Sequence, residues 1–353
     1  MTESSIIERI KVRQLSLTPA ITLPERLSDC KAFDVVLVEV QLASGEIGYG
    51  DALVVDGSTP ETLEQAWSIV CTLSEASIGI TTAEAAQCFL SSHRAAPHAV
   101  TALMAALETA SGILRLDTPV EYPLTGVIET GDPTDVDESL EMLRSGAWEV
   151  ARLTLGGNVA NDLAMIERVR SVLGGRVRLR LDGDQAYTPS DAVELVTALD
   201  PIGIDWLNQP CLAGDWGAAL AVRHAARVPL ALAGFVFDDD DIRRAADAAD
   251  IVGLGFAQMG GQDALRDAIS IAELRGLRCF LGGCLQTDLT TLQEILAGGD
   301  ALLDIVIPSI ALEPVLAGEV SRVSGLATFQ PSTPLQLHED TLDRCTLQEL
   351  SFS

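Results

Sequence analysis

The chain has 353 residues, a formal net charge of −28 and a hydrophobic fraction of 48%. So large a negative charge argues against nucleic acid and against an anionic membrane as partners. Seven scattered cysteines without a C-x-x-C pair, no N-terminal signal and no apolar run of bilayer length predict a reduced, cytoplasmic protein.

The first third of the chain is predicted to form a small α+β region. Alternating apolar residues predict strands over Ile6–Leu17, over Phe33–Ala43 and from Ile47 onward. Helical spacing then predicts helices over Pro60–Leu73, Ala83–Ser91 and His98–Leu114. The third helix is rich in alanine and apolar on most faces, so we expect it to be buried.

From Tyr122 onward, short apolar runs alternate with amphipathic helices. The predicted strands are Leu124–Val127, Glu149–Leu155, Val177–Leu181, Ile204–Leu207, Leu230–Ala233, Ile251–Phe256, Arg278–Leu281 and Leu303–Ile307. The predicted helices are Asp135–Ser145, Asp162–Val172, Ser190–Leu199, Trp216–Ala226, Asp239–Ala248, Gln262–Arg275 and Leu289–Ala297. A β/α unit that repeats about every 25 residues, seven or eight times, is typical of a closed parallel barrel.

The predicted fold is therefore α/β, with two domains. An N-terminal α+β capping domain is expected over residues 1–121, and a (β/α)₇β barrel over residues 122–327. The end of the chain lacks the β/α rhythm. We expect this tail, residues 328–353, to fold back and complete the capping domain.

Two carboxylates follow the strand predicted over Val177–Leu181. Asp182 ends that strand and Asp184 comes two residues later, before a new helix start. Ligands bind at the carboxyl ends of the strands in parallel α/β proteins. The pair could hold a hard cation or move a proton, or it could simply cap the turn and the helix.

Five short motifs, in order, resemble those of the enolase superfamily, in its mandelate racemase, muconate cycloisomerase and dipeptide epimerase branch. Ala43–Asp51 resembles "dG-GyGE", Leu179–Tyr187 "R-V-D-A-N-Q-G-W", Leu207–Pro210 "E-Q-P", Gln258–Gly261 "K-x-G-G", and Gly282–Thr287 "G-C-M-L-E-S". The resemblance covers nearly the whole chain and implies an enolase-type barrel with a capping domain. It also implies proton abstraction next to a carboxylate, with Mg²⁺ stabilising the enediolate.

The resemblance places unusual residues at the positions that carry the chemistry. Asp182 matches the first of three acidic Mg²⁺ ligands, but Asn208 stands at the second and Gly234 at the third. One carboxylate and one amide offer little charge to Mg²⁺. We therefore expect no cofactor, with Mg²⁺ held by Asp182, and weakly by Asn208, as the alternative.

The family's catalytic lysines are also replaced. Arg152 and Thr154 stand at the lysine positions of the second barrel strand, and Gly255 at that of the sixth. Gln286 replaces a family glutamate on the seventh strand, and residues 148–160 and 250–262 contain no lysine. Arginine stays protonated at any working pH, so it is a poor general base.

Three functions are compatible with this pattern, and whether the chain is an enzyme stays open. The first is an isomerase or lyase that acts on a small carboxylate by altered, Mg-independent acid/base chemistry. Its catalytic residues would be Arg152, Thr154, Asp182 and Asp184, and its substrate-binding residues Arg152, Tyr187, Asn208 and Gln286.

The second function is that of a non-catalytic pseudoenzyme or ligand-binding protein, in which a salt bridge between Arg152 and Asp182 replaces the ion. The third is an ordinary Mg²⁺-dependent racemase or cycloisomerase. A homo-oligomer is expected in each case. Specificity is expected to depend on the loops Thr18–Ala32 and Val54–Pro60, which contain Pro24, Arg26 and Lys31.

Overall fold

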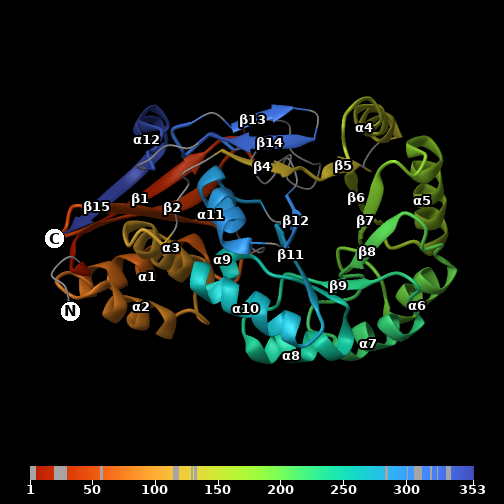
Figure 1. The fold of residues 1–353 in the computed structure, drawn as a ribbon, viewed down its shortest axis with the longest axis horizontal. Helices are drawn as coiled ribbons and strands as arrows, with labels where there is room; N and C mark the ends of the chain where they lie inside the picture. Colours follow the sequence, from red (N-terminus) through yellow and green to blue (C-terminus); the bar gives the residue numbers. More distant parts are fainter. Residues whose placement is uncertain are drawn as a thin grey trace.

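The structure is a computed structural model. It describes residues 5–19, 30–55, 59–113, 119–128, 130, 133–282, 285–299, 301–305, 312–318, 320–323, 325–330 and 335–353. Pro24 and Arg26 of the first predicted specificity loop lie outside these residues. The described chain forms an α+β domain beside a parallel β/α barrel, which confirms the predicted fold class (Figure 1).

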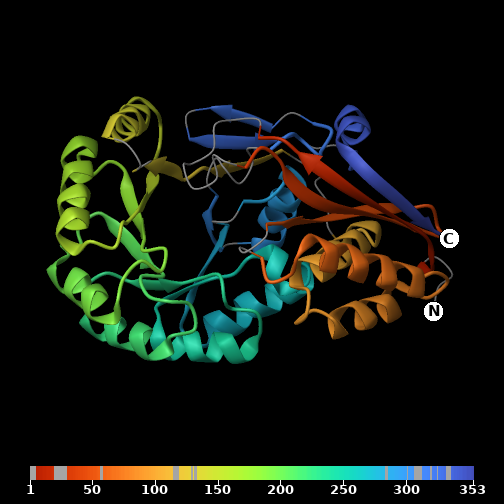
Figure 2. The same cartoon turned by 180° about the vertical axis from the view of Figure 1, so that it is seen from behind.

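The capping domain is built on a four-stranded antiparallel sheet in the order β15-β1-β2-β3. These strands are β15 (Thr346–Phe352), β1 (Ile7–Leu17), β2 (Phe33–Leu42) and β3 (Ile47–Val54). The pairing of β15 with β1 confirms that the tail returns to the first domain. Both chain ends therefore lie at the same end of the molecule, far from the outer barrel helices (Figure 2).

Three helices cover one face of this sheet: α1 (Leu63–Ala76), α2 (Thr82–Ser91) and α3 (Pro97–Ala110). Thr62 and Thr81 start the first two helices with capping boxes, in which the threonine and the third helical residue exchange hydrogen bonds. Helix α3 is buried along nearly its whole length, as its alanine-rich sequence predicted. Gly48 and Gly50 of β3 let α3 approach closely, because a Cβ on either would lie 2.1 Å from an α3 backbone atom.

The barrel sheet contains eight strands that neighbour one another in chain order. They are β5 (Gly126–Ile128), β6 (Val150–Thr154), β7 (Arg178–Asp182), β8 (Ile204–Asn208), β9 (Leu230–Leu232), β10 (Ile251–Gly253), β11 (Arg278–Gly282) and β12 (Leu302–Asp304). The backbone N–H of Thr125 donates to the carbonyl of Ile305 at 2.8 Å, which links the first strand to the last.

The barrel helices form an arc outside the strands (Figure 1). They are α4 (Pro133–Ser145), α5 (Val159–Leu173), α6 (Pro189–Ala198), α7 (Trp216–Ala225), α8 (Asp239–Ala248), α10 (Gln262–Leu274) and α11 (Asp288–Gly298). Leu153, Leu181 and Leu207 belong to the apolar core shared with these helices. Because side chains alternate along a strand, their neighbours in sequence point into the barrel.

The structure corrects two element predictions. The strand predicted over Ile251–Phe256 ends at Gly253, and a short helix α9 (Phe256–Met259) follows, whose first N–H donates to buried Glu294. The tail also forms β13 (Val320–Val323) and β14 (Leu326–Phe329), which extend β4 (Val120–Pro123) into a three-stranded sheet, and α12 (Glu339–Cys345). No helix among the residues covered by the structure is long and apolar enough to cross a membrane.

Candidate active site at the barrel mouth

Polar residues from neighbouring strands meet on one side of the barrel interior. In the strand register, Arg152 of β6 lies beside Arg180 of β7. Two residues further along these strands, Asp182 of β7 lies between Thr154 of β6 and Asn208 of β8. Residues two apart on a strand share a face, so all five side chains belong to the inner wall. The opposite part of the interior is apolar and contains Trp206, Ala231, Ile251 and Phe280.

Asp304, at the end of β12, joins two of these residues. Its carboxylate accepts a hydrogen bond from Arg152 Nη2 and another from Arg180 Nη1, the latter at 2.8 Å. Asp304 is only 1% exposed, and both arginines are buried. Burial alone would raise the pKa of Asp304, but Arg152 and Arg180 together hold that pKa below its usual value.

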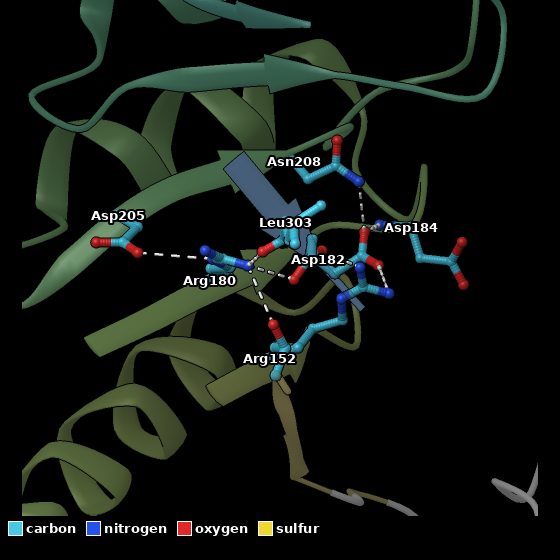
Figure 3. A network of polar contacts seen from close by, with 9 residues as sticks. Arg152, Arg180, Asp182, Asp184, Asp205, Asn208 and Leu303 are labelled. Atoms are coloured by element: carbon cyan, nitrogen blue, oxygen red, sulfur yellow. Dashed lines mark hydrogen bonds and ion pairs between the residues drawn. The ribbon is translucent and has the colours of Figure 1, made fainter. Parts of the chain in front are cut away.

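Arg180 is fixed from several directions (Figure 3). Its Nη1 also donates to Thr125 Oγ1 at 3.0 Å and to the Leu303 carbonyl at 2.7 Å. Its guanidinium carbon lies 4.2 Å from the centre of the Trp206 ring, at the distance of a cation–π contact. Arg180 thus connects the polar and apolar parts of the interior.

Arg180 and Asp304 were not among the site residues predicted from the sequence. The sequence carries a signal for each of them. Arg180 lies two residues before Asp182, so the two side chains share one face of the strand. Asp304 is the single charged residue in the apolar run Leu302–Ile305. A charge at such a position indicates a buried ion pair.

Asp182 presents its carboxylate at the mouth, with its side chain 14% exposed. Its Oδ1 accepts from Asn208 Nδ2 and from the backbone N–H of Asp184, both at 3.2 Å. Its Oδ2 lies 4.0 Å from Arg152 Nη1. The carboxylate is thus oriented by two donors on one oxygen and faces a guanidinium with the other (Figure 3).

The predicted salt bridge between Arg152 and Asp182 is therefore only part of the arrangement. Arg152 donates to Asp304, whereas its nearest contact with Asp182 is long for an ion pair. Asp304 binds Arg152 more closely because it is fully enclosed beside both guanidinium groups. Arg152 is shared between a buried carboxylate and one at the mouth.

Two predicted site residues turn away from this arrangement. Asp184 lies in the left-handed backbone region with φ of 42°, and its carboxylate points away from Asp182 and Arg152 (Figure 3). Tyr187 is 4% exposed, and its hydroxyl donates to Asp162 Oδ2 at 2.5 Å. The catalytic role of Asp184 and the substrate-binding role of Tyr187 stay predictions, and in this structure the Tyr187 hydroxyl is engaged by Asp162.

Gln286 and Gly255 lie near strands β10 and β11, on another part of the mouth. Gln286 Nε2 donates to Glu294 Oε2 at 2.9 Å, and both residues line a small cavity together with Gly255. Gly234 follows β9 with φ of +86° and offers no side-chain ligand. The structure thus brings Arg152, Thr154, Asp182 and Asn208 together and places Gln286 in a separate cluster.

The oxygen donors available to a metal ion are few. No group of three or more His, Cys, Asp or Glu side chains in the described part of the chain is arranged to hold one. Asp182 supplies a carboxylate, and the buried Asn208 Oδ1 has no hydrogen-bond partner there. Mg²⁺ keeps several waters and often needs only one or two protein ligands beside its substrate, so these two oxygens fit it in part.

Comparisons with known proteins agree on one family. Residues 135–302 match the family model "Enolase C-terminal domain-like". N-succinyl-L-Arg/Lys racemase from Bacillus cereus is 26% identical over 72% of this chain and 74% of its own length. Its crystal structure superposes with a TM-score of 0.84 and 20% identity over 99% of this chain and 100% of that one.

Two further relatives carry other activities in their names. Muconate cycloisomerase 1 from Pseudomonas putida is 26% identical over 80% of this chain and 83% of its own length. A dipeptide epimerase from Cytophaga hutchinsonii, crystallised with Mg and the dipeptide D-Ala-L-Val, has a TM-score of 0.83. It is 17% identical over 99% of this chain and 100% of that one.

These relatives correct the expectation that no cofactor is needed. A protein of the same fold holds Mg in its crystal structure, so the missing acidic ligands do not justify excluding Mg²⁺. Charged protein ligands alone do not decide whether Mg²⁺ binds, because water and substrate oxygens complete its coordination.

Proposed function

Because the chain belongs to the enolase superfamily, we propose that it binds a small carboxylate at the barrel mouth and isomerises or cleaves it there. The named relatives include a racemase and a cycloisomerase, which supports isomerase chemistry. The reaction would begin with removal of a proton from the carbon next to the carboxylate, which is the step that the family resemblance implies.

The geometry of Asp182 carries this proposal. Asn208 and the Asp184 backbone orient its carboxylate, and its other oxygen faces Arg152 at the mouth. An oriented, partly exposed carboxylate can accept or return a proton. Arg152 is the nearest fixed cation, and it would stabilise negative charge that develops on the ligand. Thr154 lies beside Asp182 in the strand register and would add a hydroxyl group close to the bound ligand.

Asp182 and the Oδ1 atom of Asn208 would hold Mg²⁺ in this site. When bound, the ion supplies positive charge for the substrate carboxylate. Asp304 pairs with both Arg152 and Arg180, and Arg180 also has Asp205 as a partner at 3.6 Å, so Arg152 is the guanidinium that faces Asp182. Asp182 would thus be either a ligand of the ion or the acceptor of the proton, and Arg152 would stabilise negative charge on the ligand in both cases.

A non-catalytic ligand-binding protein is the second candidate. It is favoured by the hydrogen bond from Arg152 to Asp304, which already occupies the residue at a family lysine position. It is also favoured by the lack of lysine over residues 148–160 and 250–262. Such a protein would keep the carboxylate site and lack proton transfer.

Titration calorimetry and proton exchange separate these candidates. We expect at least one member of a panel of small dicarboxylates and N-acylated amino acids to bind in the presence of Mg²⁺. Arg152→Met should weaken this binding about tenfold or more, because a charge-assisted contact is lost. Arg168→Met, on an exposed arginine, should leave it unchanged.

Deuterium incorporation next to the ligand carboxylate, followed by NMR in D₂O, then tests catalysis. Exchange that Asp182→Asn abolishes would support the enzyme. Binding without exchange would support the ligand-binding protein. Equal binding by wild type and Arg152→Met would contradict the proposed carboxylate site.

A further inference from the structure

A small cavity of about 30 Å³ lies where the capping domain meets the barrel mouth. His98, at the start of α3, lines it from the capping domain. Gly255, Gln258, Gln286 and Glu294 line it from the barrel. A space of this size holds one water molecule or one group of similar size.

Glu294 gives the cavity a buried negative group. It is 1% exposed, and its Oε1 accepts from the backbone N–H of Phe256 at 2.9 Å. Its Oε2 accepts from Gln286 Nε2 at 2.9 Å. No lysine, arginine or histidine nitrogen in the described ranges forms an ion pair with it. A buried carboxylate with donors but no cation is costly unless it gains a proton or a positive partner.

His98 and Gln258, which also line the cavity, can supply further acceptors. His98 forms a hydrogen bond with the Leu53 backbone carbonyl, which places its proton on one ring nitrogen. Its other nitrogen, Nε2, is buried and has no hydrogen-bond partner among the described residues. Burial lowers the pKa of His98, which keeps the ring neutral and Nε2 an acceptor.

Gln258 completes the set of acceptors. Its Oε1 lies 3.2 Å from the point where a Cβ on Gly255 would stand. Gly255 has no side chain, and it therefore leaves room beside this oxygen. The cavity thus has three acceptors around it: a carboxylate, an imidazole nitrogen and an amide oxygen. A small, positively charged group with several N–H donors would complement them.

We propose that this cavity binds an ammonium group, that is, the protonated end of a primary amine. An ammonium group has three donors, which match the three acceptors, and its charge would balance Glu294. The amine could belong to the carboxylate ligand, in which case this site rests on the proposed function. It could also belong to a separate small amine, in which case the two sites are independent.

The first experiment uses methylammonium chloride alone and measures the melting temperature of the wild-type protein. At 100 millimolar we expect a rise of about 2 °C over the same concentration of tetramethylammonium chloride, since only an ion bound to the native state stabilises it. Tetramethylammonium has no N–H donor and exceeds the cavity. Glu294→Gln should abolish the difference, and Glu273→Gln, on an exposed glutamate, should keep it.

Gly255→Ala is an independent second variant. Its backbone φ of −92° suits alanine, and the added methyl group would enter the space beside Gln258. We expect it to abolish the methylammonium effect even if Glu294→Gln fails to fold. No difference between the two ammonium salts in wild type, or a difference that survives in Gly255→Ala, would overturn the proposal.

The second experiment compares 4-aminobutyrate with 4-hydroxybutyrate by titration calorimetry in the presence of Mg²⁺. If the amine belongs to the carboxylate ligand, the amino compound should bind about tenfold more tightly, and Glu294→Gln should remove this preference. A methylammonium effect without carboxylate binding would reject the proposed function and assign the cavity to a separate amine. Carboxylate binding without any methylammonium effect or amine preference would reject the ammonium site and keep the proposed function.

Discussion

At the scale of single residues, Asp304 is the shared counter-charge of the polar part of the barrel interior. It pairs with two buried guanidinium groups that come from the neighbouring strands β6 and β7. Removing one partner of a buried ion pair leaves an uncompensated charge, which costs far more than losing a surface pair. Arg152 depends on this contact for its orientation toward Asp182.

Asp304→Asn is therefore expected to lower the free energy of unfolding by about 3–5 kcal/mol, because Arg152 and Arg180 lose their shared counter-charge. Urea unfolding at pH 7 measures the change. The matched control is Asp137→Asn, which removes the partner of exposed Arg168 and should cost at most about 1 kcal/mol. Equal effects of the two substitutions would show that the buried network contributes little to stability.

At the scale of elements, the positions of strands and helices could be predicted largely from the sequence. The period of the apolar residues located all eight barrel strands, and α8 (Asp239–Ala248) begins and ends where it was predicted. The same pattern placed Asp182 at a strand end. Local periodicity suffices here, because each barrel strand is short and bounded by an amphipathic helix.

The contacts between distant elements could not be predicted in this way. The pairing of Arg152 with Asp304 requires β12 to return beside the first strands, across a sequence separation of 152 residues. The sheet formed by β4, β14 and β13 likewise joins segments far apart in the chain. No local pattern encodes such pairing, so the partner of Arg152 was assigned to nearby Asp182.

Helix α3 and strand β3 provide a prediction at this scale. Gly48→Ala would place a Cβ 2.1 Å from the Ala110 nitrogen and 2.2 Å from the Ala106 carbonyl oxygen, so the helix must move away. We expect a loss of about 3 kcal/mol or more in the free energy of unfolding, measured with urea. Gly217→Ala, on the exposed face of α7, would place its Cβ in ordinary contact with Asp215 Oδ1 at 3.6 Å and should be neutral or slightly stabilising. A small effect of Gly48→Ala would mean that α3 does not pack as tightly as described.

At the scale of the whole molecule, buried carboxylates join the capping domain to the barrel. Asp51 of β3 accepts hydrogen bonds from the Thr287 and Thr290 hydroxyls at the start of α11. Glu108 of α3 accepts from the backbone N–H of Gln262, at 2.7 Å, at the start of α10. Burial raises the pKa of Asp51 to about 6 and that of Glu108 to about 7.

Asp288, at the start of α11, binds the backbone of the segment that follows the last barrel strand. It accepts from the backbone N–H groups of Val315, at 3.0 Å, and Leu316, at 3.2 Å. Burial raises the pKa of Asp288 to about 7, and the charge of Asp51 raises it further. The contacts between the capping domain, the barrel and residues 315–316 thus rely on acids whose pKa values are raised in the folded protein.

These shifts predict a stability that falls as pH rises. A carboxyl group with a raised folded-state pKa binds its proton more tightly in the folded than in the unfolded chain. Its contribution is fully present below the unfolded pKa of about 4 and is lost as pH rises through the folded value. For Asp51, Glu108 and Asp288 the loss falls between about pH 4 and pH 7.

Asp51→Asn tests this directly, because asparagine keeps an acceptor for the threonine hydroxyls and cannot ionise. The free energy of unfolding of the wild type should fall between pH 5 and pH 8, and Asp51→Asn should flatten that fall by roughly 1–2 kcal/mol. Repulsion within a chain of net charge −28 acts in the same direction. Glu64→Gln is the control for this repulsion, because it removes an exposed negative charge. It should leave the pH dependence of the free energy of unfolding nearly unchanged. Equal slopes for Asp51→Asn and wild type would show that Asp51 is ionised in the folded protein throughout this range.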